Sequence, residues 1–421
     1  MIRALVVFLA LAVLAAAGAW LADHPGRVVM DWRGHRLETS VAVLGVLMAA
    51  FAASVAGLYR LWRWLRGGPA RLGSWSSAGR RRRGYAALTQ GLVAAAAGDA
   101  KLARAQAKRA EAMLDDPSLT LLLAAQAAQL DGDHAAARQH FSAMLQRPDT
   151  EFLGLRGLIV QASRDGDRET ALALARRAFA LRPDTPWLLN TLFELQTDAG
   201  QWREARQTLQ HAVKRGVVDK AAGRHREAAL LLAEARQADG AAALKLAEQA
   251  RGLAPDFVPA AALATRLQAA QGNAKKARRT AAAAWALQPH PEIAAAHAAI
   301  DAQAEPAQRL EAVKALVAGQ PQHRESRLAL ANVAIAAGHF AAARDAVAAA
   351  EGDADGRVHR LLAKLEESEH GDTPAHRAAL MKVLDSPREP RWICTACHEP
   401  APEWTAKCPR CGAFDRLEWR N

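Results

Sequence analysis

The chain has 421 residues, of which 51% are hydrophobic but only 5% aromatic, and its formal net charge is +12. Alanine supplies most of the hydrophobic excess, which suits close-packed helices and argues against a β-rich core. All four cysteines lie within the last 28 residues, which excludes a disulfide framework spread through the chain.

Two apolar stretches open the chain. Residues 4–22 and 41–59 each contain 19 residues without a charge. Because about 20 apolar residues in a helix cross a bilayer, the sequence predicts a membrane hairpin over residues 1–66, with an outer loop at 23–40. The first stretch also fits a cleaved signal peptide, although Arg3 alone would form its basic region. The loop suits either a small β-hairpin turning at Arg33-Gly34 or an irregular connection.

A strongly basic segment follows the second stretch. Eight arginines and no acidic residue lie between residues 60 and 83, and without them the net charge falls from +12 to +4. Basic residues beside a membrane span stay in the cytoplasm, so the sequence predicts a multi-pass protein with its C-terminal part inside the cell. We expect segment 60–83, including a basic linker at 67–83, to contact the membrane surface. Arginine with tryptophan also suits single-stranded nucleic acid, but topology explains the segment and no nucleic acid is expected.

Glycine then recurs at a fixed period over residues 84–386. Gly98, Gly132, Gly166 and Gly200 are each 34 residues apart, and the series continues less regularly at Gly240, Gly272, Gly338 and Gly371. Glycine ends a first helix and aspartate caps a second, and this period is typical of tetratricopeptide repeats. The sequence therefore predicts an all-α solenoid of about nine helix pairs.

Two irregularities interrupt the period. Glu305 stands where one landmark glycine is missing, and six extra residues separate Gly200 from Gly240. We expect these extra residues at 216–223, as a long turn or as lengthened helices.

Small residues mark the predicted helix contacts. Alanine recurs five residues after the landmark glycine, at Ala103, Ala137, Ala171, Ala205, Ala277 and Ala343. Such residues let neighbouring helices approach closely, and large ones such as Phe141, Leu172 and Leu102 are expected to fill the spaces between them. The resulting superhelix has a concave face suited to binding proteins. The histidines share no frame, so we expect them on the surface or in the groove, and no catalytic centre is predicted.

The tail, residues 387–421, carries the most specific local motif. Its cysteines, Cys394, Cys397, Cys408 and Cys411, form a C-x2-C-x10-C-x2-C pattern. Two such knuckles present four thiolates to one structural Zn²⁺ ion, whose binding stabilises a unit too small for a core of its own. Gly412 permits the tight turn of the second knuckle. Four aromatic residues are expected to cover the site or dock it against the last helices of the array: Trp392, Trp404, Phe414 and Trp419.

Two other cofactors fit part of this motif. Residues 394–398 match the C-x-x-C-H pattern of covalent haem attachment, which leaves Cys408 and Cys411 unexplained and requires a tail outside the cytoplasm. Four thiolates also suit iron in a rubredoxin-like site. Zinc is the predicted metal, with haem and iron as the alternatives.

The order of these elements resembles the HemY family of bacterial inner-membrane proteins. The resemblance rests on three N-terminal motifs and on the ending at residues 408–419, which is similar to a zinc ribbon; the motifs are Ala22-Asp23-His24-Pro25-Gly26-Arg27-Val28, Asp31-Trp32 and Glu38-Thr39-Ser40-Val41. It implies a non-enzymatic membrane scaffold in a late step of protohaem IX (porphyrin) biosynthesis, with haem-biosynthesis enzymes as partners.

Two alternatives to this function stay open. A LapB-type regulator of lipopolysaccharide assembly also combines an anchor, repeats and a rubredoxin-like site, although the second apolar stretch and the loop motif favour HemY. The other alternative is a haem-handling protein.

Overall fold

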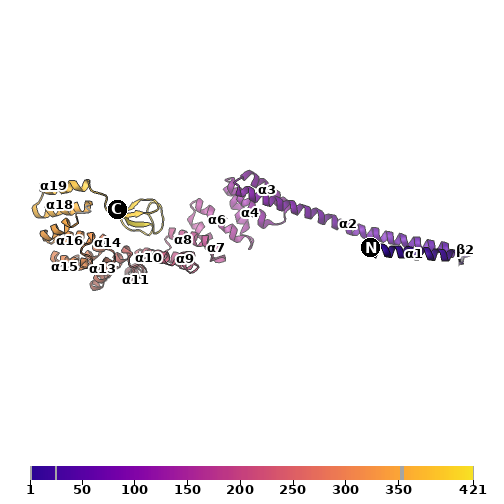
Figure 1. The fold of residues 1–421 in the computed structure, drawn as a ribbon, viewed down its shortest axis with the longest axis horizontal. Helices are drawn as coiled ribbons and strands as arrows, with labels where there is room; N and C mark the ends of the chain where they lie inside the picture. The colour runs from indigo at the N-terminus through magenta and orange to yellow at the C-terminus, as the bar shows by residue number, and fades with distance from the viewer. Residues whose placement is uncertain (1, 24–25, 351–354, 421) are drawn as a thin grey trace. The chain divides into compact units, whose positions relative to one another are not determined.

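The structure is a computed structural model that describes residues 2–23, 26–350 and 355–420 (Figure 1). It falls into two compact units, residues 1–131 and 132–421. Of the N-terminal motifs, His24 and Pro25 lie outside the described residues, and so do the side chains of residues 64–77.

The first unit begins with two long helices joined by a β-hairpin. Helices α1 (Ile2–Asp23) and α2 (Val41–Ala96) lie side by side for part of their length (Figure 1). Between them, β1 (Arg27–Trp32) and β2 (His35–Ser40) pair antiparallel. The turn residues, Arg33 and Gly34, have φ angles of 53° and 89°, which is the left-handed pair that a two-residue type I′ turn requires. The outer loop is therefore a hairpin and not an irregular connection.

Helix α2 is 56 residues long and serves two parts of the fold. Its first part, Val41–Arg63, is unburied and is the one segment found among the described residues that is long and apolar enough to cross a membrane. Its last part packs against α3 (Ala100–Met113) and α4 (Pro117–Leu130). The second predicted span coincides with this helix, whereas a second crossing through α1 is not confirmed. Residues 67–83, the expected linker, are helical and lie within α2.

The second unit continues the array and ends in a small sheet. Counted along the chain, the end of α2 and the described helices up to α19 amount to nine pairs. The helices of this unit are α5 (His134–Met144), α6 (Glu151–Arg164), α7 (Arg168–Leu181), α8 (Pro186–Asp198), α9 (Trp202–Lys214), α10 (Lys220–Gln237), α11 (Gly240–Leu253), α12 (Val258–Ala270), α13 (Ala274–Leu287), α14 (Pro291–Ala298), α15 (Pro306–Val317), α16 (Arg324–Ala336), α17 (Phe340–Ala348), α18 (Gly356–His370) and α19 (Pro374–Leu384).

The turns between helices repeat one construction. The four glycines that are 34 residues apart have φ angles between 68° and 80°, the left-handed conformation in which glycine ends a helix. Asp99, Asp133 and Asp167 then cap the next helix, because their carboxylates accept the backbone N–H three residues later at 2.9–3.0 Å. The predicted roles of glycine and aspartate are confirmed.

Alanine forms the contact surface between the helices. All six alanines of the predicted frame, from Ala103 to Ala343, are fully buried. Phe141 and Leu172 are also buried, but Leu102 is 45% exposed, so its predicted place in the core was wrong. Helix α3 buries a stripe of alanines that includes Ala107, and this turns Leu102 toward solvent.

The two sequence irregularities have structural counterparts. The extra residues after Gly200 lengthen α10 to 18 residues, beyond a turn at Gly216. Where the landmark glycine is missing, α14 has only eight residues and gives way to a 3-10 turn at Ala299–Asp301. Glu305 starts the next helix without a side-chain cap. The missing glycine thus marks the place where the regular packing of the array is interrupted.

Close helix approach can be tested at Gly157 in α6. A Cβ atom there would lie 2.3 Å from the ring of Phe141, so Gly157→Ala forces the α5–α6 contact apart. We expect it to lower the free energy of unfolding by about 1–3 kcal/mol, measured by urea unfolding of the purified protein. Gly252→Ala in α11, where a Cβ meets nothing within 4 Å, is the matched control and should be neutral or stabilising by up to about 1 kcal/mol. Equal unfolding midpoints for the two variants would contradict this packing.

Candidate metal centre and its docking surface

The C-terminal sheet brings the four cysteines together. Strand β3 (Arg391–Cys394) lies between β4 (Pro400–Ala401) and β5 (Leu417–Arg420), and residues 391–420 are called the ribbon below. The sulfur atoms of the four cysteines all lie within 4.8 Å of one another. Two pairs far apart in the motif, Cys394–Cys411 and Cys397–Cys408, have Sγ–Sγ distances of 3.7 Å.

These distances fit a single tetrahedral metal ion. Four sulfurs at about 2.3 Å from Zn²⁺ lie about 3.8 Å apart, whereas a disulfide requires about 2.05 Å. The cysteines are unbridged, in agreement with the longer distance. The donor set and its spacing therefore suit a structural metal, and four thiolates accept either zinc or iron.

The two knuckles share one backbone turn. The Cys394 carbonyl accepts the N–H of His398 at 2.8 Å, and the Cys408 carbonyl accepts the N–H of Gly412 at 2.9 Å. The residue after the second cysteine is left-handed in both, with φ angles of 58° at His398 and 71° at Gly412. His398 thus occupies the turn position that Gly412 occupies in the other knuckle. The turn explains the C-x-x-C-H pattern without haem.

The thiols compete for protons, as expected of a ligand cluster. Burial alone would raise the pKa of Cys408, but the backbone N–H groups of Cys411 and Arg410 outweigh burial and lower this pKa to about 7. At Cys397 the N–H of Glu399 favours the thiolate, but burial and the neighbouring sulfurs raise the pKa to about 12. A metal ion would relieve this competition, because it binds the thiolate form.

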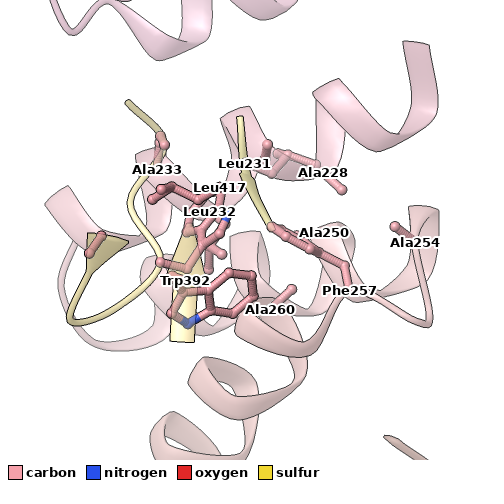
Figure 2. Close-up of a cluster of buried hydrophobic side chains, with 14 of the residues drawn as sticks. Ala228, Leu231, Leu232, Ala233, Ala250, Ala254, Phe257, Ala260, Trp392 and Leu417 are labelled. Carbon is pink, nitrogen blue, oxygen red and sulfur yellow. The ribbon is translucent and has the colours of Figure 1, made fainter. Parts of the chain in front are cut away.

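The ribbon docks on the middle of the array. Its aromatic residues were predicted either to cover the metal site or to dock it against the last helices, and the second of these predictions was wrong. Trp404 is 1% exposed and its ring centroid lies 5.0 Å from that of Phe257, which directly precedes α12. Trp392 and Leu417 join the same core with residues of α10, α11 and α12 (Figure 2). Alanines of these helices, such as Ala229, Ala250 and Ala260, leave room for the indole rings.

Polar and aromatic contacts extend the docking surface to both sides. On α8, Asp198 forms an ion pair with Lys407, and the Phe193 ring centroid lies 5.4 Å from that of Phe414. On α14, the Glu292 carboxylate accepts the indole N–H of Trp392 at 2.6 Å. These contacts come mainly from first helices of successive pairs, α8, α10, α12 and α14. First helices line the inner face of a tetratricopeptide superhelix, so the ribbon covers part of the face that we expected to be open.

Two histidines at this surface have pKa values shifted in opposite directions. His290 is 1% exposed and its ring centroid lies 4.4 Å from that of Trp419. Burial, together with Arg357, lowers its pKa to about 4. A hydrogen bond with Asp415 raises the pKa of His225 on α10 despite partial burial. Sequence reasoning did not single out His290, and its only local signal is the proline that follows it at the start of α14.

The metal centre can be tested by comparing variants of the two knuckles. We expect purified protein to hold about one metal ion per chain, and Cys408→Ser to lose it. Without the metal the ribbon has too little core to stay folded, so amide exchange in α10 and α12 should speed up about tenfold or more. His398→Gly keeps the turn and should retain both the metal and the slow exchange. A covalent haem absorption band that is present in the wild type and lost in His398→Gly would contradict this assignment.

The docking should also weaken in mild acid. In the unfolded chain His290 takes up a proton near pH 6.5, whereas the buried ring does so only near pH 4. Between these pH values the unfolded state binds more protons than the folded state. The free energy of unfolding therefore falls as the pH drops. The loss is at most about 3 kcal/mol. His225 acts in the opposite sense, since its raised pKa adds stability that is fully present below about pH 6.5.

Urea unfolding of the ribbon, followed by tryptophan fluorescence at a series of pH values, measures this effect. His290→Asn keeps an acceptor for the N–H of Glu292 and should flatten the pH dependence relative to the wild type. His225→Gln should make the fall in stability with decreasing pH steeper than in the wild type. If the free energy of unfolding of His290→Asn changes with pH as steeply as that of the wild type, the ring does not titrate at this surface.

Comparison with known proteins identifies two parts of the chain. Residues 26–149 match the family described as HemY protein N-terminus, and residues 162–222 match the tetratricopeptide repeat. The probable magnetosome protein Mms48 of Magnetospirillum gryphiswaldense is 26% identical over 100% of this chain and 93% of its own length. Protein HemY of Escherichia coli K12 is 29% identical over 48% of this chain, and the match spans about half (51%) of HemY.

Among solved structures, a tetratricopeptide repeat protein from Parabacteroides merdae is 15% identical, with a TM-score of 0.29 over 56% of this chain and 94% of that protein. The predicted resemblance is confirmed for the N-terminal domain and for the repeats. Residues 26–149 thus resemble the HemY N-terminal domain, and the tetratricopeptide repeats that follow are a fold suited to binding proteins.

Proposed function

We propose that this chain is a membrane-anchored, non-enzymatic scaffold that binds enzymes of late protohaem synthesis at the cytoplasmic face of the inner membrane. The observation that carries the proposal is the HemY N-terminal match at residues 26–149, which covers the hairpin, α2 and the first repeats as one piece. The helix that contains the apolar segment Val41–Arg63 also supplies the first helix of the array. The anchor and the first helix of the array are therefore parts of one helix, α2.

The orientation rests on charge. The arginines between residues 60 and 83 follow directly on the apolar segment of α2, and such residues remain on the cytoplasmic side. If α1 also crosses the membrane, the protein is multi-pass with both ends inside. The same basic segment then lies near anionic lipid headgroups.

In this proposal the metal is zinc with a structural role. Cys394, Cys397, Cys408 and Cys411 would hold it, and a reducing cytoplasm favours four thiolates over disulfides. The ion would fix the two knuckles so that Trp404 and Trp392 face the array. The metal site thus supports the interaction surface and takes no part in a reaction.

The full-length similarity to Mms48 supports a second candidate, a scaffold of the magnetosome. Both candidates use the array to bind proteins, and they differ in which proteins are bound. In the LapB-type alternative, the same anchored repeat array binds proteins of lipopolysaccharide assembly.

The haem assignment can be tested in a deletion strain. We expect late porphyrin intermediates to accumulate several-fold and to return to normal when the full chain is supplied. Affinity capture of the N-terminally tagged protein from membranes should recover a haem-synthesis enzyme, and the Cys408→Ser variant should recover less of it. Normal porphyrins together with capture of magnetosome or lipopolysaccharide proteins would contradict the haem assignment and favour an alternative.

A further inference from the structure

The C-terminal third of the array contains a groove that the ribbon leaves open. Three adjoining cavities of about 250, 640 and 300 Å³ lie along α13–α18, and together they are called the α14–α18 groove. The first two cavities share His297 and Asp301, and the first and third share Asn332 and Lys364. The shared residues show that the three cavities adjoin one another along the array.

The groove lies where the repeat period fails. Because α14 stops after eight residues, His297 and the 3-10 turn at Ala299–Asp301 line space that a regular first helix would fill. His297 is 4% exposed, and its Nδ1 atom has no hydrogen-bond partner in the described part of the chain. A buried polar atom without a partner is costly, and the residue that carries this one lines the first cavity.

Some cations of the lining are paired with acidic side chains, and others are not. Asp301 is engaged by Arg278 at 2.6 Å, and Glu325 is engaged by Arg357 at 2.9 Å. In contrast, no ion pair within the described ranges engages Arg309 or Lys364, both of which line the first cavity. The Lys364 ammonium donates to the side-chain oxygen of Asn332 at 3.0 Å, which leaves the amide N–H groups of Asn332 free to donate.

The chain already places one carboxylate of its own at the end of this groove. Glu389 belongs to the segment without helix or strand that connects α19 to the ribbon, and it forms an ion pair with Arg360 of the third cavity. Its carboxylate also lies close to Gly356, where a Cβ atom would be only 2.7 Å from the Glu389 Oε1 atom. An acidic side chain from a segment without helix or strand is therefore a ligand that this surface accepts.

We propose that the α14–α18 groove binds an acidic extended segment of a partner protein, with its carboxylates on Arg309 and Lys364. Carboxylates match isolated guanidinium and ammonium groups through charge-assisted hydrogen bonds. A nucleic acid fits less well, because Asp301 and Glu325 already hold Arg278 and Arg357 in ion pairs, which leaves few cations for a backbone with a phosphate at every nucleotide. The inference refines the proposed function, since it rests on the array being a protein-binding surface and names the part that binds.

Binding of a fluorescent decaglutamate peptide to the purified full-length protein tests the groove directly. We expect saturable binding in fluorescence anisotropy, weakened by salt, and at least about tenfold weaker binding in the double variant Arg309→Gln/Lys364→Gln. The matched control is Lys101→Gln/Arg109→Gln, which removes the same charge from exposed positions on α3 and should bind like the wild type. Ala312→Phe keeps every charge but fills the first two cavities, and it should also weaken binding.

Three results would overturn the inference. These are an equal affinity for decaglutamine, an equal effect of the two double variants, or unchanged binding in Ala312→Phe with the fold intact by circular dichroism. Affinity capture from membranes separates this inference from the proposed function. If the groove double variant loses decaglutamate but still captures a haem-synthesis enzyme, the groove is not the partner site and the proposed function stands. If the wild type binds decaglutamate but captures no such enzyme, the groove stands and the haem assignment fails.

Discussion

Burial of the ribbon's indole rings against an alanine-lined surface is the contact on which the second unit depends. Trp404 and Trp392 lie in one core with α10, α11 and α12, and each ring removes about 200 Å² from water, worth at most about 5 kcal/mol. The contact joins residues far apart in sequence, since Lys407 and Asp198 are separated by 209 positions. Closing so long a loop costs conformational entropy, and a ribbon held by a metal ion offers a preformed surface to offset it.

This contact changes what the array can offer to other proteins. A tetratricopeptide superhelix ordinarily presents its inner face, but here the ribbon covers first helices from α8 to α14. A further uncovered polar surface lies beyond the ribbon along the chain, where the shortened α14 opens a groove beside His297. One part of the array is thus used to hold the chain's own tail, and the next part remains available for a partner.

The sequence was a sound guide wherever a pattern had a local physical cause. The left-handed turn at Gly98 and the cap at Asp99 follow from adjacent residues, and the cysteine spacing predicts the cluster of four sulfurs that the C-terminal sheet assembles. The docking of Trp404 could not be predicted, because it depends on alanines between positions 228 and 260, far back along the chain, that look like every other helix contact. The groove had a signal, the missing glycine at Glu305, but a sequence irregularity does not show whether the helix lengthens, as in α10, or ends early, as in α14.

In the proposed account, a membrane anchor, an array partly covered by the ribbon and an open groove for an acidic segment together make a scaffold with a defined binding region. The most direct test places a photo-crosslinking amino acid at one of two positions in the full chain and irradiates intact membranes. At Asn332, in the groove, we expect capture of another protein. At His225, which faces Asp415 of the ribbon, we expect a crosslink within the chain to residues near 415. Capture of a partner from position 225, with no internal product and nothing captured from position 332, would contradict this account.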